Sequence, residues 1–184
     1  MKEFIKSIRK IDIVILIISF IILLFLDQYT KYLTEKNLEL NETHKFIDGF
    51  MNFTYIRNRG ASFGMLQGKQ ALFIILTTVL LPIMLFVYLK ISVIINVCSD
   101  VINKVRMQFL NISVLLIFIG ALGNFIDRLR FSYVIDFLDV QFIDFPVFNV
   151  ADCYVTVGTF LLFIIIFIMK EKELDLVIKS RKKW

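Results

Sequence analysis

Four long stretches of apolar residues divide the chain, and each is long enough to cross a lipid bilayer as a helix. The hydrocarbon core of a bilayer is about 30 Å thick, which corresponds to roughly 20 residues of α-helix. The stretches cover residues 13–33, 71–89, 107–126 and 147–169. They predict an α-helical membrane protein with four transmembrane helices, organised as a single integral membrane domain over residues 1–184.

The segment between the first two stretches, residues 34–70, has a pattern of its own. Its run Met51–Ile56 alternates apolar and polar side chains, which is typical of a β-strand. Asp48-Gly49 marks a turn before this run, and Asn58-Arg59-Gly60 ends it. We therefore expect a small extracytoplasmic β-sheet and loop region between the first and second helices, lying against the membrane surface.

Composition and charge agree with a protein of the bilayer. Hydrophobic residues make up 58% of the chain, and the mean hydropathy is +0.78. A net charge of +5 might suggest nucleic acid in a soluble protein, but here Lys and Arg gather at the two termini. Because cytoplasmic segments of membrane proteins carry an excess of Lys and Arg, we expect both termini and the charged tail 170–184 to be cytoplasmic, and no nucleic-acid partner. Residues 34–70 and 129–146 then lie outside.

Polar side chains that are costly near the hydrocarbon gather at the outer ends of the predicted helices. A Ser-His or Cys-His site would need a histidine at that depth, but the single histidine, His44, lies in an exposed loop. A zinc site would need more His or Cys ligands than this chain has. The pattern therefore favours paired carboxylate chemistry without a metal or another cofactor. The acids at this depth are Asp27, Asp127, Asp136, Asp139 and Asp152, accompanied by Lys31, Arg128, Asn58, Asn124 and Asn149.

Simpler structural roles explain each of these residues when it is taken alone. Asp152 would favour the positive end of the fourth helix, and Asp27 and Lys31 are four residues apart, as in an intrahelical ion pair. Asp127-Arg128 reads as a local pair at a helix end. Two non-enzymatic functions also fit intramembrane acids: a small transporter or proton-relay subunit, and a structural assembly subunit. The absence of charges from the second and third stretches counts against a continuous polar path.

Five short motifs, in order, connect this chain to a known family. They are Asp27-Gln-Tyr-Thr-Lys31, Asn52-Phe-Thr-Tyr-Ile-Arg-Asn58-Arg-Gly60-Ala61-Ser-Phe63-Gly64, Gly120-Ala-Leu-Gly-Asn124-Phe-Ile-Asp127-Arg128-Leu, Val134-Ile-Asp136-Phe137 and Phe145-Pro-Val-Phe-Asn149-Val-Ala151-Asp152. Over residues 27–160 the sequence resembles the bacterial lipoprotein signal peptidases, also called signal peptidase II. Each motif is weak alone, but five in order within a four-span chain are specific.

The resemblance implies a function and a set of site residues. It implies an intramembrane aspartic endopeptidase of the bacterial cell membrane, with its active site near the outer face. The enzyme would remove the signal peptide from a prolipoprotein by cutting before a diacylglyceryl-modified cysteine, in contact with membrane lipids, and would be inhibited by globomycin. By resemblance Asp136 and Asp152 form the catalytic dyad. The other positions that carry over are Asp27, Lys31, Asn58, Gly60, Gly120, Asn124, Arg128, Asn149 and Ala151.

Four residues depart from the pattern of that family. Arg59 stands where Thr is common, Ile119 and Ser132 replace frequent glycines, and Cys153 follows the second aspartate where Ser is common. None of them is a member of the implied dyad. They bear on the conformation of the loops and on the fit of inhibitors.

Overall fold

The computed structural model describes residues 10–60 and 68–179, and its main elements are helices. Four of them are long and apolar enough to cross a membrane, which confirms the predicted fold class. They are α2 (Lys10–Asn37), α3 (Gln70–Val97), α4 (Val101–Phe131) and α5 (Val150–Ile168), and a short helix α6 (Glu171–Lys179) follows. The basic residues of the first nine positions, the motif residues 61–64 and the last five residues of the tail lie outside the described residues.

Several helices extend beyond the predicted spans, with α3 reaching Val97 rather than residue 89. Two of the differing ends have a clear local cause. α4 begins at Val101 rather than near residue 107, because the Asp100 side chain accepts a hydrogen bond of 2.7 Å from the Asn103 backbone N–H and caps the helix. Lys104 and Arg106 therefore lie within α4, and only residues 98–100 connect α3 to α4. α5 begins at Val150 rather than near residue 147, because Asn149 is its N-cap.

α4 is the central helix of the bundle. Half of its most apolar window is buried, against 6% for α2 and for α3. It packs closely on α5 at two glycines, since an added Cβ on Gly120 would collide with the backbone of Ala151, and one on Gly158 would meet Ile117 at 2.8 Å. Away from the sheet, buried apolar side chains of α3, α4 and α5 form the core, including Ile91, Met107, Ile119 and Ile165.

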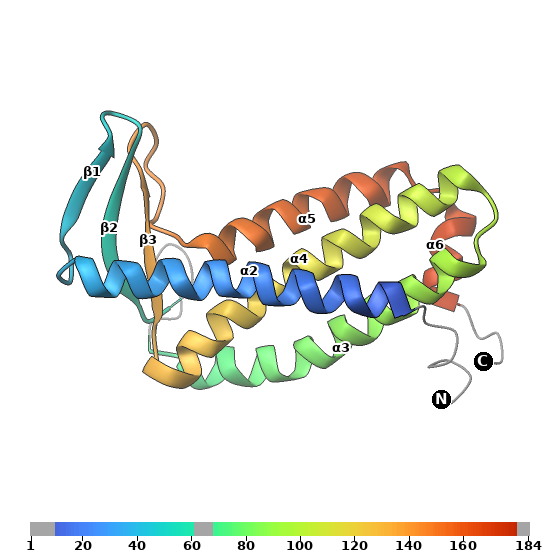
Figure 1. The fold of residues 1–184 in the computed structure, drawn as a ribbon, viewed down its shortest axis with the longest axis horizontal. Coiled ribbons are helices and arrows are strands. Elements are labelled where there is room, and N and C mark those ends of the chain that lie inside the picture. Colours follow the sequence, from blue (N-terminus) through green and yellow to red (C-terminus); the bar gives the residue numbers. More distant parts are fainter. Residues whose placement is uncertain (1–9, 61–67, 180–184) are drawn as a thin grey trace.

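A three-stranded antiparallel sheet lies across one end of the bundle, opposite to α6 (Figure 1). Strands β1 (Thr43–Ile47) and β2 (Met51–Asn58) come from the predicted region between the first two spans. The third strand, β3 (Val134–Val140), comes from the connection between α4 and α5 and was not predicted. Its register with β2 places Asp136 opposite Ile56. β3 lacks an alternating pattern because Val134–Phe137 are buried on both faces.

A left-handed residue turns the chain from α4 into β3. Ser132 has φ 63° and ψ 19°, and its backbone N–H donates to the Arg128 carbonyl at 3.1 Å. This is the usual position for glycine after a helix, because a Cβ is crowded at positive φ. The departure from the family glycine at this position therefore leaves a strained serine at the start of the segment that leads to Asp136.

We expect the stability of the protein to depend on the backbone freedom of residue 132. Since Ser132 is exposed, its side chain contributes little packing. Ser132→Val should lower the free energy of unfolding by about 1–2 kcal/mol relative to Ser132→Gly. Thermal unfolding in detergent measures the difference.

Leu129→Gly is the matched control, because Leu129 is also exposed but lies inside α4. Glycine there should be destabilising by about 1 kcal/mol relative to the parent chain. Equal stability of the two Ser132 variants would contradict the argument from positive φ.

Candidate active site

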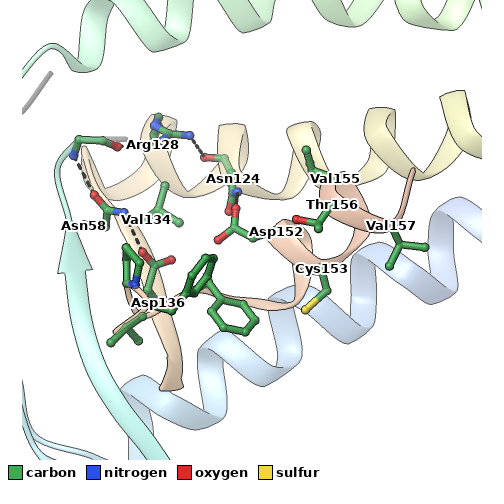
Figure 2. Close-up of a pocket in the computed structure, with 15 residues that line it drawn as sticks. Asn58, Asn124, Arg128, Val134, Asp136, Asp152, Cys153, Val155, Thr156 and Val157 are labelled. Atoms are coloured by element: carbon green, nitrogen blue, oxygen red, sulfur yellow. Dashed lines mark hydrogen bonds between the residues drawn. The ribbon is translucent and has the colours of Figure 1, made fainter. Parts of the chain in front are cut away.

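Asp136 and Asp152 come from different elements and line the same cavity of about 540 Å³ (Figure 2). Asp136 projects from β3, and Asp152 lies in the first turn of α5. Side chains of Asn124 and Arg128 line the cavity from α4. The remaining wall is mostly apolar and includes Val134, Phe145, Pro146, Val147, Phe148, Val155 and Val157. The cavity therefore combines two carboxylates with an apolar surface.

The start of α5 is fixed by a capping box. The Asn149 side-chain oxygen accepts from the Asp152 backbone N–H at 3.0 Å, and the Asp152 carboxylate accepts from the Asn149 backbone N–H at 3.2 Å. Asp152 therefore does stabilise the start of the fourth spanning helix, as its sequence position suggested. Its second oxygen, Oδ1, remains on the cavity side and accepts from the Asn124 side chain at 2.7 Å. Asp152 therefore both caps α5 and lines the cavity.

Asn149 joins the two carboxylates through its amide group. Its Nδ2 donates to Asp136 Oδ1 at 2.6 Å and to Asn124 Oδ1 at 3.1 Å, while its Oδ1 faces the Asp152 backbone. Both ends of one side chain are therefore used, which leaves a single orientation of the amide. The N-cap of α5 thus sets the position of Asp136 as well as that of Asp152.

Asp136 is almost completely buried, with 2% of its surface exposed. Its other oxygen accepts from the Asn58 side chain at 2.8 Å, and the Asn58 oxygen in turn accepts from the Gly60 backbone N–H at 2.9 Å. Burial raises the pKa of Asp136 to about 7, and the charge of Asp152 adds to the effect, although the amides of Asn58 and Asn149 oppose it. Asp136 therefore holds a proton near neutral pH.

A buried ion cluster lies directly beside the cavity. The ammonium group of Lys31 is 2.9 Å from Asp27 and 2.9 Å from Asp127, and it donates to Asn124 Oδ1 at 3.0 Å. Lys31, Asp27 and Asp127 are each exposed by 2% or less. All three donors of the ammonium group are used, which offsets the cost of burying the charge. Because Asn124 also contacts Asp152, this cluster fixes one wall of the cavity.

The two acids of the cluster also hold the backbone next to each candidate catalytic residue. Asp27 accepts from the Ala151 backbone N–H at 2.9 Å, one residue before Asp152. Asp127 accepts from the Ile135 backbone N–H at 3.3 Å, one residue before Asp136. A single buried cluster thus aligns the start of α5 and strand β3.

Arg128 lies at the other end of the cavity. Its guanidinium donates to the Gly60 carbonyl at 3.3 Å and to the Asn124 carbonyl at 3.5 Å, and it lies 4.7 Å from the centre of the Phe73 ring. Within residues 10–60 and 68–179, its buried Nε has no hydrogen-bond partner. The local ion pair with Asp127, one of the simpler roles that the sequence allowed, is absent from the described residues, where Asp127 instead pairs with Lys31.

All the site residues named from the sequence lie in or beside this arrangement. Asn58, Gly60, Asn124, Arg128, Asp136 and Asp152 line the cavity, and Asp27, Lys31, Asn149, Gly120 and Ala151 support it. Asp139, the other acid at this depth, instead accepts from Thr54 at 2.6 Å. Within residues 10–60 and 68–179, the structure has no group of three or more His, Cys, Asp or Glu side chains that could hold a metal ion.

Two members of the buried ion cluster were not among the site residues predicted from the sequence. One is Asp127. The other is Gln28, whose Nε2 lies 3.1 Å from Asp27, 3.0 Å from Asp127 and 3.3 Å from the Gly123 carbonyl. The position of Asp127 directly after a long apolar stretch was a sequence signal that could have marked it as a site residue. Nothing in the sequence distinguishes Gln28 from an ordinary interfacial residue, because two of its three partners, Gly123 and Asp127, are on another helix.

Comparison with known proteins gives a consistent result. The model of the family described as signal peptidase (SPase) II matches residues 19–168. The chain is 38% identical over 161 residues to the lipoprotein signal peptidase of Enterococcus faecalis, covering 86% of this chain and 92% of that protein. It is also 38% identical over 165 residues to that of Fusobacterium nucleatum, covering 89% and 93%.

Solved structures of bacterial membrane enzymes share the fold. One structure, determined by the in meso method at 2.3 Å resolution, has a TM-score of 0.71 and 30% identity, covering 92% of this chain and 93% of that chain. A second, at 1.9 Å resolution, has a TM-score of 0.66 and 34% identity, covering 85% and 93%. The likeness therefore extends over most of both chains.

We expect loss of the Lys31 charge to be strongly destabilising. Lys31→Met would leave the buried carboxylates of Asp27 and Asp127 without their cation, at a cost of about 3–5 kcal/mol. Thermal unfolding in detergent measures this loss. Adding Asp127→Asn to Lys31→Met should recover part of it, because one of the two buried charges is then removed.

Lys45→Met is the matched control. Lys45 and Asp48 form an ion pair of 3.8 Å with both side chains at least 80% exposed. Such a surface pair contributes little, so the thermal midpoint should stay nearly unchanged. Similar losses of thermal stability in the two lysine variants would show that the burial of Lys31 does not increase its contribution to stability.

Proposed function

This chain belongs to the signal peptidase II family, and we propose that Asp136 and Asp152 are its catalytic dyad. The chain is an aspartic endopeptidase that removes the signal peptide from prolipoproteins. The observation that carries the assignment of the dyad is the shared wall of one cavity, on which the buried Asp136 and the half-buried Asp152 lie together.

The two carboxyl groups have different roles in the proposed mechanism. Asp136 holds the shared proton, because burial and the neighbouring charge of Asp152 raise its pKa to about 7. Asp152 acts as the base and takes a proton from water as the water oxygen attacks the scissile carbonyl carbon. Asp136 gives its proton to the carbonyl oxygen, so that no full negative charge develops there. Collapse of the tetrahedral intermediate breaks the carbon–nitrogen bond, as Asp152 gives its proton to the leaving amine and a hydroxyl group of the intermediate returns a proton to Asp136.

The surrounding polar groups position the dyad and the substrate. Asn149 and Asn58 each donate to one oxygen of Asp136, and Asn124 donates to Asp152. These donors hold both carboxyl groups in fixed rotamers before the substrate arrives. Arg128 lines the cavity, and its buried Nε has no hydrogen-bond partner in the part of the chain that the structure describes, so it would donate to a carbonyl group of the bound peptide.

The apolar wall of the cavity suits a substrate that arrives from the bilayer. The signal helix would enter laterally, with the two acyl chains of the diacylglyceryl cysteine remaining among the membrane lipids. Val155 and Val157 of α5 and Phe148 before it line the cavity beside the dyad. Globomycin-type inhibitors would occupy the same cavity in place of the peptide.

The distribution of Lys and Arg supports the orientation of the chain in the bacterial cell membrane. With both termini cytoplasmic, the sheet and the dyad lie near the outer face. The catalytic cavity is then on the side to which prolipoproteins are exported. A transporter or proton relay would need polar groups through the full depth, whereas the charged cluster of Lys31, Asp27 and Asp127 is confined to the end of the bundle beside the sheet.

We expect Asp136→Asn and Asp152→Asn each to abolish cleavage of a diacylglyceryl-modified prolipoprotein. General acid–base groups contribute about 10²–10⁴-fold to a rate, so each variant should lose at least about 10²-fold in kcat/KM. Purified protein and a synthetic lipidated peptide suffice for the assay, and thermal unfolding verifies that each variant is folded.

Asp139→Asn is the control within the same strand. Asp139 accepts a hydrogen bond from Thr54, and it is absent from the wall of the cavity. An asparagine oxygen can accept the same hydrogen bond, so cleavage should remain close to that of the parent enzyme. Normal cleavage by either dyad variant would contradict the assignment.

The pH dependence of kcat/KM should report the protonation of Asp136. Since Asp136 must carry a proton, we expect kcat/KM to fall as the pH rises through about 7. Asn58 donates to this carboxyl group and lowers its pKa, so Asn58→Ala should move the alkaline limb to higher pH. A limb that stays in place, or moves to lower pH, would contradict the role given to Asp136.

A further inference from the structure

A group of apolar side chains remains exposed at the hairpin end of the sheet. We call Phe46, Phe50, Phe142, Ile143 and Phe145 the aromatic fringe, and each is between 45% and 58% exposed. Phe46 and Phe50 flank the turn between β1 and β2, and the other three belong to the connection between β3 and α5. A cluster of this kind outside the membrane spans indicates an interaction surface.

The aromatic fringe is ordered by contacts among its own residues. The rings of Phe50 and Phe142 are stacked with centroids 5.0 Å apart, and the Gln141 backbone N–H donates to the Phe50 carbonyl at 2.9 Å. Phe46 packs on Phe53 of β2 at 4.9 Å, and Phe145 on Phe148 at 5.6 Å. The turn and the connection thus form one preformed surface.

The position of the aromatic fringe indicates that its partner is the lipid bilayer. In Figure 1 the strands run across the direction of the helices, and the hairpin end of the sheet extends sideways beyond α5. None of the described helices lies beside this overhang. The outer surface of α5 presents Phe160, Phe163 and Phe167, each at least 66% exposed, to the lipid. α5 begins five residues after Phe145, so the aromatic fringe lies close in the chain to the end of a helix that faces lipid.

We propose that the aromatic fringe inserts into the bilayer leaflet beside the sheet and anchors the sheet to the membrane. Aromatic rings favour the boundary between headgroups and acyl chains, where an apolar ring and a polar environment meet. The ligand is the lipid surface itself. The proposal depends on the four spans and the placement of the sheet, and it is independent of the assignment of the catalytic dyad.

Neighbouring charges limit the depth of insertion. Asp48 lies in the turn between Phe46 and Phe50, and Asp144 lies between Ile143 and Phe145, and both are exposed. A carboxylate is costly in the hydrocarbon, so these residues remain among the headgroups. The rings therefore reach only the upper part of the acyl chains.

Anchoring would constrain the sheet that carries part of the cavity. Asp136 lies on β3 and Asn58 at the end of β2, so a sheet that lifts from the membrane would change the position of both. The aromatic fringe holds the far end of the same strands. The lipid surface thus becomes part of the support of the cavity.

Tryptophan fluorescence in vesicles tests the proposal. Trp184 is the single tryptophan of the chain, so Trp184→Phe provides a background in which Phe142→Trp introduces the only fluorophore. The purified variant is placed in phosphatidylcholine vesicles whose acyl chains carry bromine either near the headgroup or near the methyl end. We expect a loss of emission that is larger with bromine near the headgroup.

Phe160→Trp in the same background is the matched control. Phe160 is ten residues into α5, which is about 15 Å along a helix and close to the middle of the bilayer. Its emission should therefore fall more with bromine near the methyl end. Phe50→Trp, at the stacking partner of Phe142, should repeat the result for Phe142→Trp and excludes an effect of one altered residue.

Two results would overturn the proposal. One is emission from Phe142→Trp that is equal in brominated and plain vesicles and is quenched by iodide from the water phase. The other is quenching by brominated lipid that appears only at high protein density, because it would indicate that a second copy of the chain brings the tryptophan to the membrane. Quenching that is independent of protein density supports direct insertion.

Discussion

The arrangement of the sheet end of this protein depends on one buried ammonium group. Lys31 is held between Asp27 and Asp127, and its third donor reaches Asn124. Each of these three partners contacts a different part of the site: the start of α5, the start of β3, and Asp152. A buried charge tolerates few geometries. The need to place all three partners around the Lys31 ammonium group therefore determines how α2, α4, α5 and the sheet pack together.

The chemistry of the cavity follows from the same requirement that buried polar groups find hydrogen-bond partners. Asp136 is buried in the sheet and has a raised pKa, yet both of its oxygens accept hydrogen bonds from asparagine amides. The amides keep the carboxyl group oriented, and the burial keeps a proton on it near neutral pH. Asp152 lies at the start of α5, where its carboxylate closes the capping box and accepts a hydrogen bond from Asn124. The two aspartates thus differ in burial and in hydrogen-bond partners.

The sequence allowed the helices to be predicted because long apolar runs have a single stable solution in a bilayer. It allowed β2 to be predicted from alternation, but β3 was missed because residues 134–137 are buried on both faces and show no alternation. The acids at the ends of the helices beside the sheet were recognised from their cost in the membrane. Their partners were not: Asp127 was expected beside Arg128 but pairs with Lys31 from another helix, and Gln28 had no signal. The contacts that these residues make cross between helices, so no local spacing encodes them.

The hydrogen bond between Asp27 and Ala151 joins residues that are 124 positions apart, on the first and the last of the four spanning helices. Because α2 leaves the ribosome before α5, the Asp27 carboxylate has no Ala151 N–H to accept from until the last spanning helix is made. The start of α5 beside Asp152 is thus held in place only when the first and the last spanning helices are both present.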